Sequence, residues 1–266
     1  MTRFPWPGAH VLVTGGSEGI GAAVAAAARE RGARVTVLAR RPDVLAATAD
    51  RIHALAAPGD VTDPASVAAA IRTAEETNGP IDVLVHCAGT ALPGRFLEVD
   101  PGEFEAQMRL NHLGTVHVLR AVLPGMVERR RGRVVVTSST AAVLGVPGYT
   151  AYGAAKAAVA SLVSALRYEV EPSGVRIGVL YPPDTETPGF AAENLRKPPE
   201  TAAVSAGIAP MTPEKVAAAV IRGVERGSAT ITVDAMTRMM LLVPGVLDPI
   251  VRPVLRRVVA KAVSRS

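Results

Sequence analysis

The stretch that decides the fold is His10-Val11-Leu12-Val13-Thr14-Gly15-Gly16-Ser17-Glu18-Gly19-Ile20-Gly21, in which a short apolar run passes directly into a glycine-rich turn. An Ala-rich segment with helical spacing follows at once. Such glycines let the chain turn sharply and let backbone N–H groups approach a phosphate. A glycine pattern alone also fits an ordinary βα turn, but the flanking strand and helix favour a dinucleotide. The expected cofactor contacts in this turn are Gly15, Ser17, Gly19, Ile20 and Gly21.

Outward from this turn, short runs rich in Val, Ile and Leu alternate with Ala-rich helical runs. The runs are continuously apolar, as in strands that are covered on both faces. The expected strands are residues 10–14, 34–39, 54–57, 81–86, 133–138, 175–181 and 229–233. The expected helices are residues 19–31, 42–52, 64–77, 101–129, 152–169 and 213–226. This order predicts an α/β chain with a single Rossmann-type, doubly wound parallel sheet of about seven strands over residues 1–234.

Two segments depart from this alternation. Residues 182–213 are long, Pro-rich and poorly periodic, which predicts a substrate lid loop. Residues 235–266 form an apolar and basic extension, in which apolar and cationic residues separate onto two faces of a helix. Such a helix suits a membrane surface that carries anionic lipid. Packing of the helix on its own domain or on a partner subunit is the equally weighted alternative.

The composition narrows the classes of function. The chain has 266 residues, of which 48% are hydrophobic and 20% charged, so it is not disordered. Cys87 is the only cysteine, which excludes a disulfide framework and favours a reducing compartment. A net charge of +5 with 3% aromatic residues gives little basis for binding nucleic acid. Without a visible targeting peptide or a spanning apolar stretch, we expect a cytoplasmic protein with peripheral membrane contact at most.

The end of the second expected strand bears on the choice of cofactor. It reads Val37-Leu38-Ala39-Arg40-Arg41, where an NAD site usually places an acidic residue. Arg40 in that place favours a 2′-phosphate and therefore NADP or NADPH, unless it only ends the strand in solvent. Glu18 would oppose that phosphate if its side chain pointed inward.

Four polar residues form a candidate catalytic group. Tyr152 and Lys156 lie one helical turn apart, and an ammonium beside a phenol lowers the phenol pKa. A tyrosine tuned in this way exchanges a proton near neutral pH. Ser139 ends a buried-type strand, where its hydroxyl can bind a carbonyl oxygen. Asn111 interrupts an otherwise helical pattern, where its amide can hold a water or bend the helix.

These residues together resemble the short-chain dehydrogenase/reductases over nearly the whole chain. The motifs that carry the resemblance are Thr14-Gly15-x-x-x-Gly19-Ile20-Gly21, Asp60-Val61, Ala88-Gly89, Asn111, Ser139 and Tyr152-x-x-x-Lys156. The resemblance implies that Tyr152 is the general acid, that Lys156 tunes it and holds the nicotinamide ribose, and that Ser139 polarises the carbonyl.

The resemblance also assigns supporting roles and reveals one departure. Asn111 would support a proton-relay water, while Asp60 and Val61 would contact the adenine. The backbone of Ala88 and Gly89 would line the cofactor. His86 stands where the family usually has asparagine, which predicts altered hydrogen bonds within the sheet at that position.

A narrower resemblance lies in the expected lid. Residues 180–198 read Leu-Tyr-Pro-Pro-Asp-Thr-Glu-Thr-Pro-Gly-Phe-Ala-Ala-Glu-Asn-Leu-Arg-Lys-Pro and look like the same run in 3-ketodihydrosphingosine reductases. These enzymes reduce the ketone of a long-chain sphingoid precursor with NADPH, and Pro182, Thr185 and Thr187 would contact the nicotinamide. Two alternatives stay open: a reductase of another lipid-like ketone, such as a 3-oxoacyl chain or a steroid, and a non-catalytic cofactor sensor. Family resemblance also implies a homo-oligomer, a dimer or a tetramer.

Overall fold

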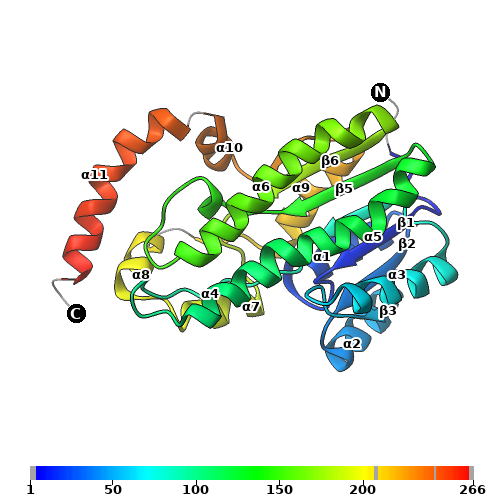
Figure 1. Cartoon of the computed structure of the whole chain (residues 1–266), viewed down its shortest axis with the longest axis horizontal. Helices are drawn as coiled ribbons and strands as arrows, with labels where there is room; N and C mark the ends of the chain where they lie inside the picture. Colours follow the sequence, from blue (N-terminus) through cyan, green and yellow to red (C-terminus); the bar gives the residue numbers. More distant parts are fainter. Residues whose placement is uncertain (1–3, 207–208, 243, 264–266) are drawn as a thin grey trace.

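The computed structural model describes residues 4–206, 209–242 and 244–263, and these residues build a seven-stranded parallel sheet (Figure 1). The strand order is β3-β2-β1-β4-β5-β6-β7. The strands are β1 (His10–Thr14), β2 (Arg34–Ala39), β3 (Leu55–Pro58), β4 (Val83–His86), β5 (Gly132–Thr137), β6 (Val175–Tyr181) and β7 (Thr230–Thr232). The predicted doubly wound sheet is confirmed, and each observed strand lies within a few residues of its expected range.

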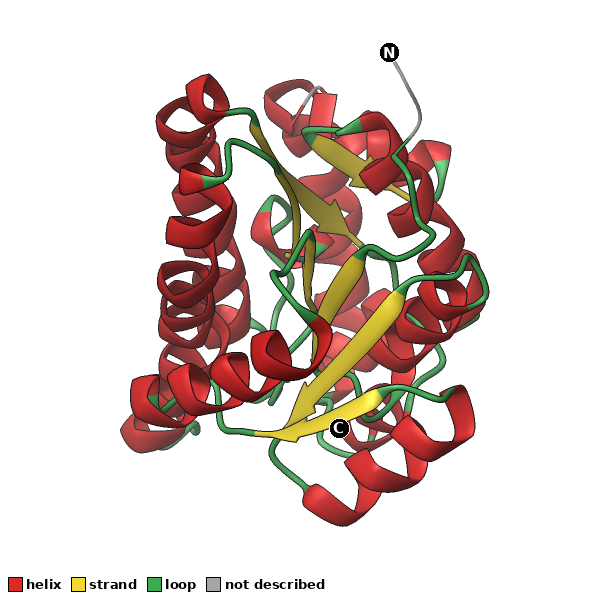
Figure 2. Cartoon of the chain, turned by 90° about the vertical axis from the view of Figure 1, so that its right-hand side faces the viewer, coloured by secondary structure: helices red, strands yellow, loops and turns green. Residues whose placement is uncertain are grey.

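Helices cover both faces of the sheet, as Figure 2 shows. One face carries α1 (Gly19–Arg29), α2 (Pro42–Ile52) and α9 (Pro213–Arg226), and the other carries α3 (Pro64–Asn78), α5 (Gly114–Glu128) and α6 (Thr150–Val170). Successive side chains of a strand point to opposite faces. In β1, Val11 and Val13 therefore pack in the core under α1, α2 and α9, whereas Leu12 packs in the core under α3, α5 and α6. Two covered faces explain why the strands read as continuous apolar runs.

Three helices begin at a polar residue followed by proline. Asp63, Asp100 and Thr212 each accept a hydrogen bond from a backbone N–H two or three residues further on. These residues precede α3, α4 (Pro101–Met108) and α9. Such a cap contributes about 1 kcal/mol because it satisfies a free N–H of the first turn.

The expected helix over residues 101–129 is confirmed as one continuous helical stretch, but one of its turns has π-helical instead of α-helical hydrogen bonding. A π-helical turn, Arg109–Leu113, separates α4 from α5. Asn111 lies in this turn and is fully buried. Its amide nitrogen donates to the carbonyl oxygen of Thr90 at 2.9 Å, and its Oδ1 accepts from the Thr90 N–H at 3.2 Å. The amide therefore ties the π-helical turn to the segment after β4.

The segment 182–213 is more ordered than a loop. It contains α7 (Pro188–Asn194) and α8 (Pro199–Ser205), and a parallel bridge pairs Thr185 with Met211. The Thr187 hydroxyl caps α7 by accepting from the Phe190 N–H at 3.0 Å. Pro188 and Pro199 stand at the first positions of these helices, where proline is well tolerated. Residues 207–208 of this segment lie outside the described residues.

The C-terminal extension consists of α10 (Ala235–Leu242) and α11 (Pro244–Val263). The second of these lies beside α8 at the end of the molecule away from the sheet (Figure 1). Val258 and Val259 are half-buried on α11, whereas Arg256 and Arg257 are exposed, so these residues show the expected two-faced helix. Among the residues that the structure describes, no helix is both long and apolar enough to cross a membrane. Residues 264–266 lie outside this description.

Candidate active site

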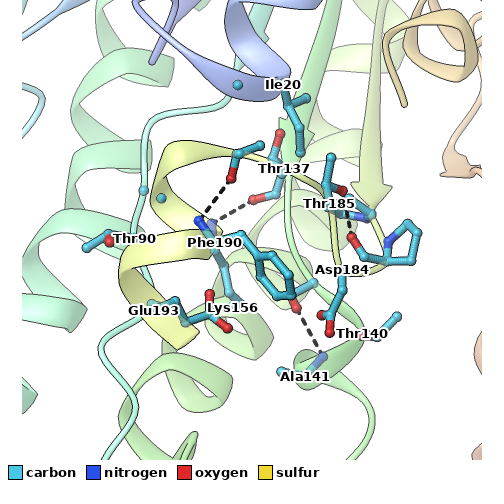
Figure 3. A pocket seen from close by; sticks show the side chains of 18 of the residues that line it. Ile20, Thr90, Thr137, Thr140, Ala141, Lys156, Asp184, Thr185, Phe190 and Glu193 are labelled. Atoms are coloured by element: carbon cyan, nitrogen blue, oxygen red, sulfur yellow. Dashed lines mark hydrogen bonds between the residues drawn. The ribbon is translucent and has the colours of Figure 1, made fainter. Parts of the chain in front are cut away.

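The carboxyl ends of four strands open into one cavity of about 780 Å³. Gly15, Ala88 and Ser139 follow β1, β4 and β5 closely, Pro182 follows β6 directly, and all four line this cavity. The strand order reverses direction between β1 and β4, and ligands of open α/β sheets bind at such a point. Figure 3 shows side chains from these elements and from α7 converging on the cavity.

The glycine turn at one end of the cavity has no room for side chains. A Cβ on Gly21 would lie 2.2 Å from the carbonyl oxygen of Gly15, and one on Gly15 would lie 2.8 Å from the backbone nitrogen of Ala88. Gly15 and Gly19 also have φ angles of +66° and +55°. No side chain caps the start of α1, so its first N–H groups and the positive end of its dipole are available to a phosphate. These residues therefore fit a dinucleotide, as expected, and Ser17 and Ile20 line the same end.

Of the residues near the expected adenosine position, some line the cavity and others do not. Arg41 forms an ion pair with Glu18, and both line the cavity. Arg40 is exposed. In the described part of the chain, the residues that line the cavity do not include Arg40, Asp60 or Val61. Burial works to raise the pKa of Asp60, but hydrogen bonds from Thr62 and the charge of Arg40 hold that pKa below its usual range.

Arg41 lines the cavity beside the glycine turn, and sequence reasoning did not assign it to the site. The signal was present, because the strand end carries two adjacent arginines and the glycine turn carries Glu18. Only the fold shows which of the two arginines faces the acidic side chain of the turn.

The catalytic candidates meet at the centre of the cavity. The helix α6 holds Tyr152 and Lys156 one turn apart, and the Lys156 ammonium lies 5.7 Å from the centroid of the Tyr152 ring. Lys156 Nζ donates to the carbonyl oxygen of Thr137 at 3.0 Å. Ser139 is hydrogen-bonded to Tyr152. The hydroxyl of neighbouring Ser138 instead donates to the Lys156 backbone oxygen at 2.9 Å, so Ser139 is the serine that faces the phenol.

Asn111 stands behind this group rather than in the cavity wall. A Cβ on Gly89 would lie 2.5 Å from Asn111 Oδ1 and 3.1 Å from Lys156 Nζ. The amide and the ammonium thus border the same glycine, and Gly89 itself lines the cavity with Ala88. Asn111 therefore holds the backbone of Thr90, next to the glycine that the Lys156 ammonium also borders.

The structure corrects the expected direction of one pKa. Burial raises the pKa of Tyr152 above its ordinary value, and the charges of Glu193 and Asp184 add to this effect, while the hydrogen bond with Ser139 lowers the pKa. Burial also lowers the pKa of Lys156 to about 8. The lowering of the phenol pKa expected from the nearby ammonium does not occur, because burial penalises the phenolate.

The unusual histidine of β4 forms a side-chain hydrogen bond to β1 through one of its two ring nitrogens. His86 and Thr14 are paired in the sheet register, and His86 Nδ1 lies 2.7 Å from Thr14 Oγ1. Both side chains are fully buried. Burial and the charge of Lys156 lower the pKa of His86 to about 3, so the imidazole is neutral. The sheet is therefore bonded between β1 and β4 without the family's asparagine.

The far half of the cavity is formed by residues that sequence reasoning did not assign. The Tyr149 hydroxyl donates a hydrogen bond to Glu193 of α7. Asp184, Phe190 and Met240 line the same region, and Thr185 and Thr187 lie at its border with the glycine turn. These residues come from three separate segments that only the fold brings together.

A phosphate-binding glycine turn with a Tyr, Lys and Ser group beside it defines a dinucleotide-dependent oxidoreductase. A family model described as short chain dehydrogenase matches residues 9–198. The chain belongs to the short-chain dehydrogenase family, which confirms the resemblance of its motifs and indicates a nicotinamide nucleotide cofactor and a small-molecule substrate.

The relatives show which members of the family are similar. The chain is 44% identical over 232 residues to a 3-ketodihydrosphingosine reductase from Bos taurus, a match that covers 84% of this chain and 70% of the relative. It is 35% identical over 272 residues to a 3-ketodihydrosphingosine reductase from Dictyostelium discoideum, covering 94% and 81%. A solved structure titled short chain dehydrogenase/reductase family protein has a TM-score of 0.76 at 29% identity, covering 87% of this chain and 97% of that one.

Proposed function

We propose that this protein reduces the ketone of 3-ketodihydrosphingosine to the secondary alcohol dihydrosphingosine, with NADPH as the electron donor. The observation that carries the proposal is the continuity of the cavity, in which the Tyr152 and Ser139 group opens directly into an apolar compartment. The similarity to reductases with this activity supports the same substrate.

The apolar compartment suits a long alkyl chain. Its walls come from α6 and the segment before it, from α7 and α8, and from α10, and they include Leu144, Val146, Phe190, Val204, Met236 and Met240. Methionine side chains adapt to a flexible chain better than branched ones. Concave sites with mostly apolar walls and a few polar groups at one end are typical of ligands with a reactive head and a hydrocarbon tail.

Each catalytic residue has a defined part in this reduction. A reduced dinucleotide held with its phosphates at the glycine turn would supply the hydride for the carbonyl carbon from its nicotinamide. The Ser139 hydroxyl donates a hydrogen bond to the carbonyl oxygen, which stabilises the negative charge that develops there. Tyr152 gives its phenol proton to that oxygen and becomes a phenolate. The Lys156 ammonium stabilises this phenolate, because opposite charges favour each other strongly in a buried site.

NADPH rather than NADH is part of the proposal because two arginines follow β2. We expect Arg41→Ala to raise the KM for NADPH about tenfold and to change the KM for NADH little, since a lost contact between arginine and phosphate costs on the order of 1–2 kcal/mol. Initial rates with both cofactors measure this, with the exposed Arg222→Ala on α9 as the control. An equal effect on NADPH and NADH would contradict the role of Arg41.

A substrate panel tests the proposed function. Oxidation of NADPH is measured with 3-ketodihydrosphingosine, a 3-oxoacyl thioester, a steroid ketone and a short-chain ketone, and each is repeated with NADH. The proposal expects the highest kcat/KM with NADPH and 3-ketodihydrosphingosine. Preference for another ketone would overturn the substrate, and no oxidation with any ketone would overturn catalysis.

The proposal places the enzyme in the cytoplasm, in peripheral contact with membranes. Met236 and Leu242 are largely exposed on α10, next to the compartment for the alkyl chain, and α11 presents exposed arginines. We expect the full chain to float with vesicles that contain anionic lipid and a chain ending at residue 234 to float several-fold less. Equal flotation of the two would contradict this contact. Sedimentation of the full chain without lipid tests the homo-oligomer that we also propose.

A further inference from the structure

The half of the cavity away from the glycine turn, here called the substrate half, is lined by acidic side chains, and the basic side chains lie in the other half. The basic side chains that line the cavity within the described residues are Arg41 and Lys156, and both belong to the cofactor half. The substrate half instead contains the carboxylates of Asp184, Glu193 and Asp234. Asp234 is engaged in capping α10, where it accepts from the N–H and the hydroxyl of Thr237. Asp184 and Glu193 remain as the acids that face the reaction centre.

These two carboxylates differ in what already binds them. Glu193 accepts the hydrogen bond from Tyr149 and lies 3.4 Å from the Lys197 ammonium, which is itself buried over the Phe190 ring. Asp184 is half-buried, and its carboxylate has no hydrogen-bond or ion-pair partner in the part of the chain that the structure describes. An acid in a ligand cavity without a cation of its own is free to pair with a cation on the ligand.

Both carboxylates line the cavity that also contains the catalytic phenol. Glu193 is hydrogen-bonded to Tyr149, whose ring lies beside that of Tyr152, and the charges of both acids raise the pKa of Tyr152. The rings of Tyr149 and Tyr152 contact each other here, with centroids 5.9 Å apart and an angle of 54° between their planes. Figure 3 shows Asp184 and Glu193 within the same pocket, with Glu193 on the helix that also holds Phe190. Carboxylates beside aromatic faces bind organic cations.

We propose that Asp184 and Glu193 bind the protonated amine on the carbon next to the ketone, so that the pocket selects 2-amino ketones over 3-oxo chains that lack the amine. This inference rests on the proposed function and defines its substrate class by charge. A neutral 3-oxo chain would leave the Asp184 carboxylate unpaired, and an anionic thioester carrier would meet repulsion from both acids.

The same subsite links recognition to catalysis. An ammonium bound between these carboxylates offsets the negative charge that raises the pKa of Tyr152. The phenolate that forms after proton transfer is then less destabilised with the amine present than without it. We therefore expect the substrate with the amine to have a higher kcat, as well as a lower KM, than the substrate without it.

The test compares two substrates across three variants. The substrates are 3-ketodihydrosphingosine and the ketone of equal chain length with hydrogen in place of the amine. The variants are Asp184→Asn, Glu193→Gln and the control Glu186→Gln, which changes an exposed acid on the same segment. We expect wild type to prefer the amine at least tenfold in kcat/KM. Asp184→Asn should lose about tenfold with the amine and no more than about twofold without it, and the control should change neither.

The outcomes separate the subsite from the proposed function. Equal losses of Asp184→Asn on both substrates, or an unchanged preference, would overturn the amine subsite. Glu193→Gln also weakens the contacts with Tyr149 and Lys197, so Asp184→Asn decides the matter if the Glu193 variant fails to fold. If wild type reduces the amine-free ketone and not 3-ketodihydrosphingosine, the proposed function fails; if it reduces both equally well, only the subsite fails.

Discussion

Tyr152→Phe is expected to lower kcat for ketone reduction about a thousandfold while NADPH binding stays within about twofold of wild type. The substitution removes the hydroxyl alone and keeps the half-buried ring that packs near Tyr149. Tyr152 is the proposed proton donor. Without its phenol, hydride transfer would leave an unprotonated alkoxide. Ser139 and the bound cofactor still stabilise part of the transition state, so a residual rate remains.

Single-turnover oxidation of NADPH measures the chemical step, and fluorescence titration measures cofactor binding. Tyr168→Phe is the matched control, because it removes the same hydroxyl from an exposed tyrosine of the same helix. A Tyr152→Phe variant with more than a tenth of wild-type kcat would contradict the role of Tyr152 as the acid. A variant that also loses NADPH binding would indicate a disturbed cavity rather than a lost proton.

The parts of the site that sequence reasoning predicted are those fixed by local geometry. The turn between β1 and α1 follows from glycines that no other residue can replace, since a Cβ on Gly21 would clash with the backbone of Gly15. Tyr152 and Lys156 share a helix face because residues four apart always do. The strands could be placed closely because burial on both faces leaves a continuous apolar run.

The parts that sequence reasoning missed depend on contacts between distant segments. The hydrogen bond of Tyr149 with Glu193 spans 44 residues, and it exists only because the fold brings α7 to the residue that precedes α6. The π-helical turn at Asn111 changes the hydrogen-bond register of a helix, whereas apolar periodicity records only which face is buried. The raised pKa of Tyr152 is a property of burial, which spacing alone does not give.

Replacement of Lys156 by Met is expected to reduce kcat/KM about a hundredfold and to change its pH dependence. Burial lowers the pKa of Lys156 to about 8, so the ammonium that stabilises the phenolate is present below that pH and lost above it. The kcat/KM of wild type should therefore decline as pH rises through about 8. Lys156→Met should show a low rate without this decline, and Lys215→Met, at an exposed position on α9, should keep the wild-type profile.

The stability of the protein distinguishes this titration from alkaline unfolding. The pKa of Lys156 falls from 10.5 to about 8 on folding, so the unfolded chain binds more protons between these values. This group therefore makes the folded state more stable as pH rises through that range, by roughly 1.4 kcal/mol per pH unit. Activity and the stability contribution of Lys156 thus move in opposite directions. If unfolding caused the alkaline loss, denaturant midpoints of wild type would fall together with activity; if Lys156 causes it, the wild-type midpoint rises relative to that of Lys156→Met while the rate declines.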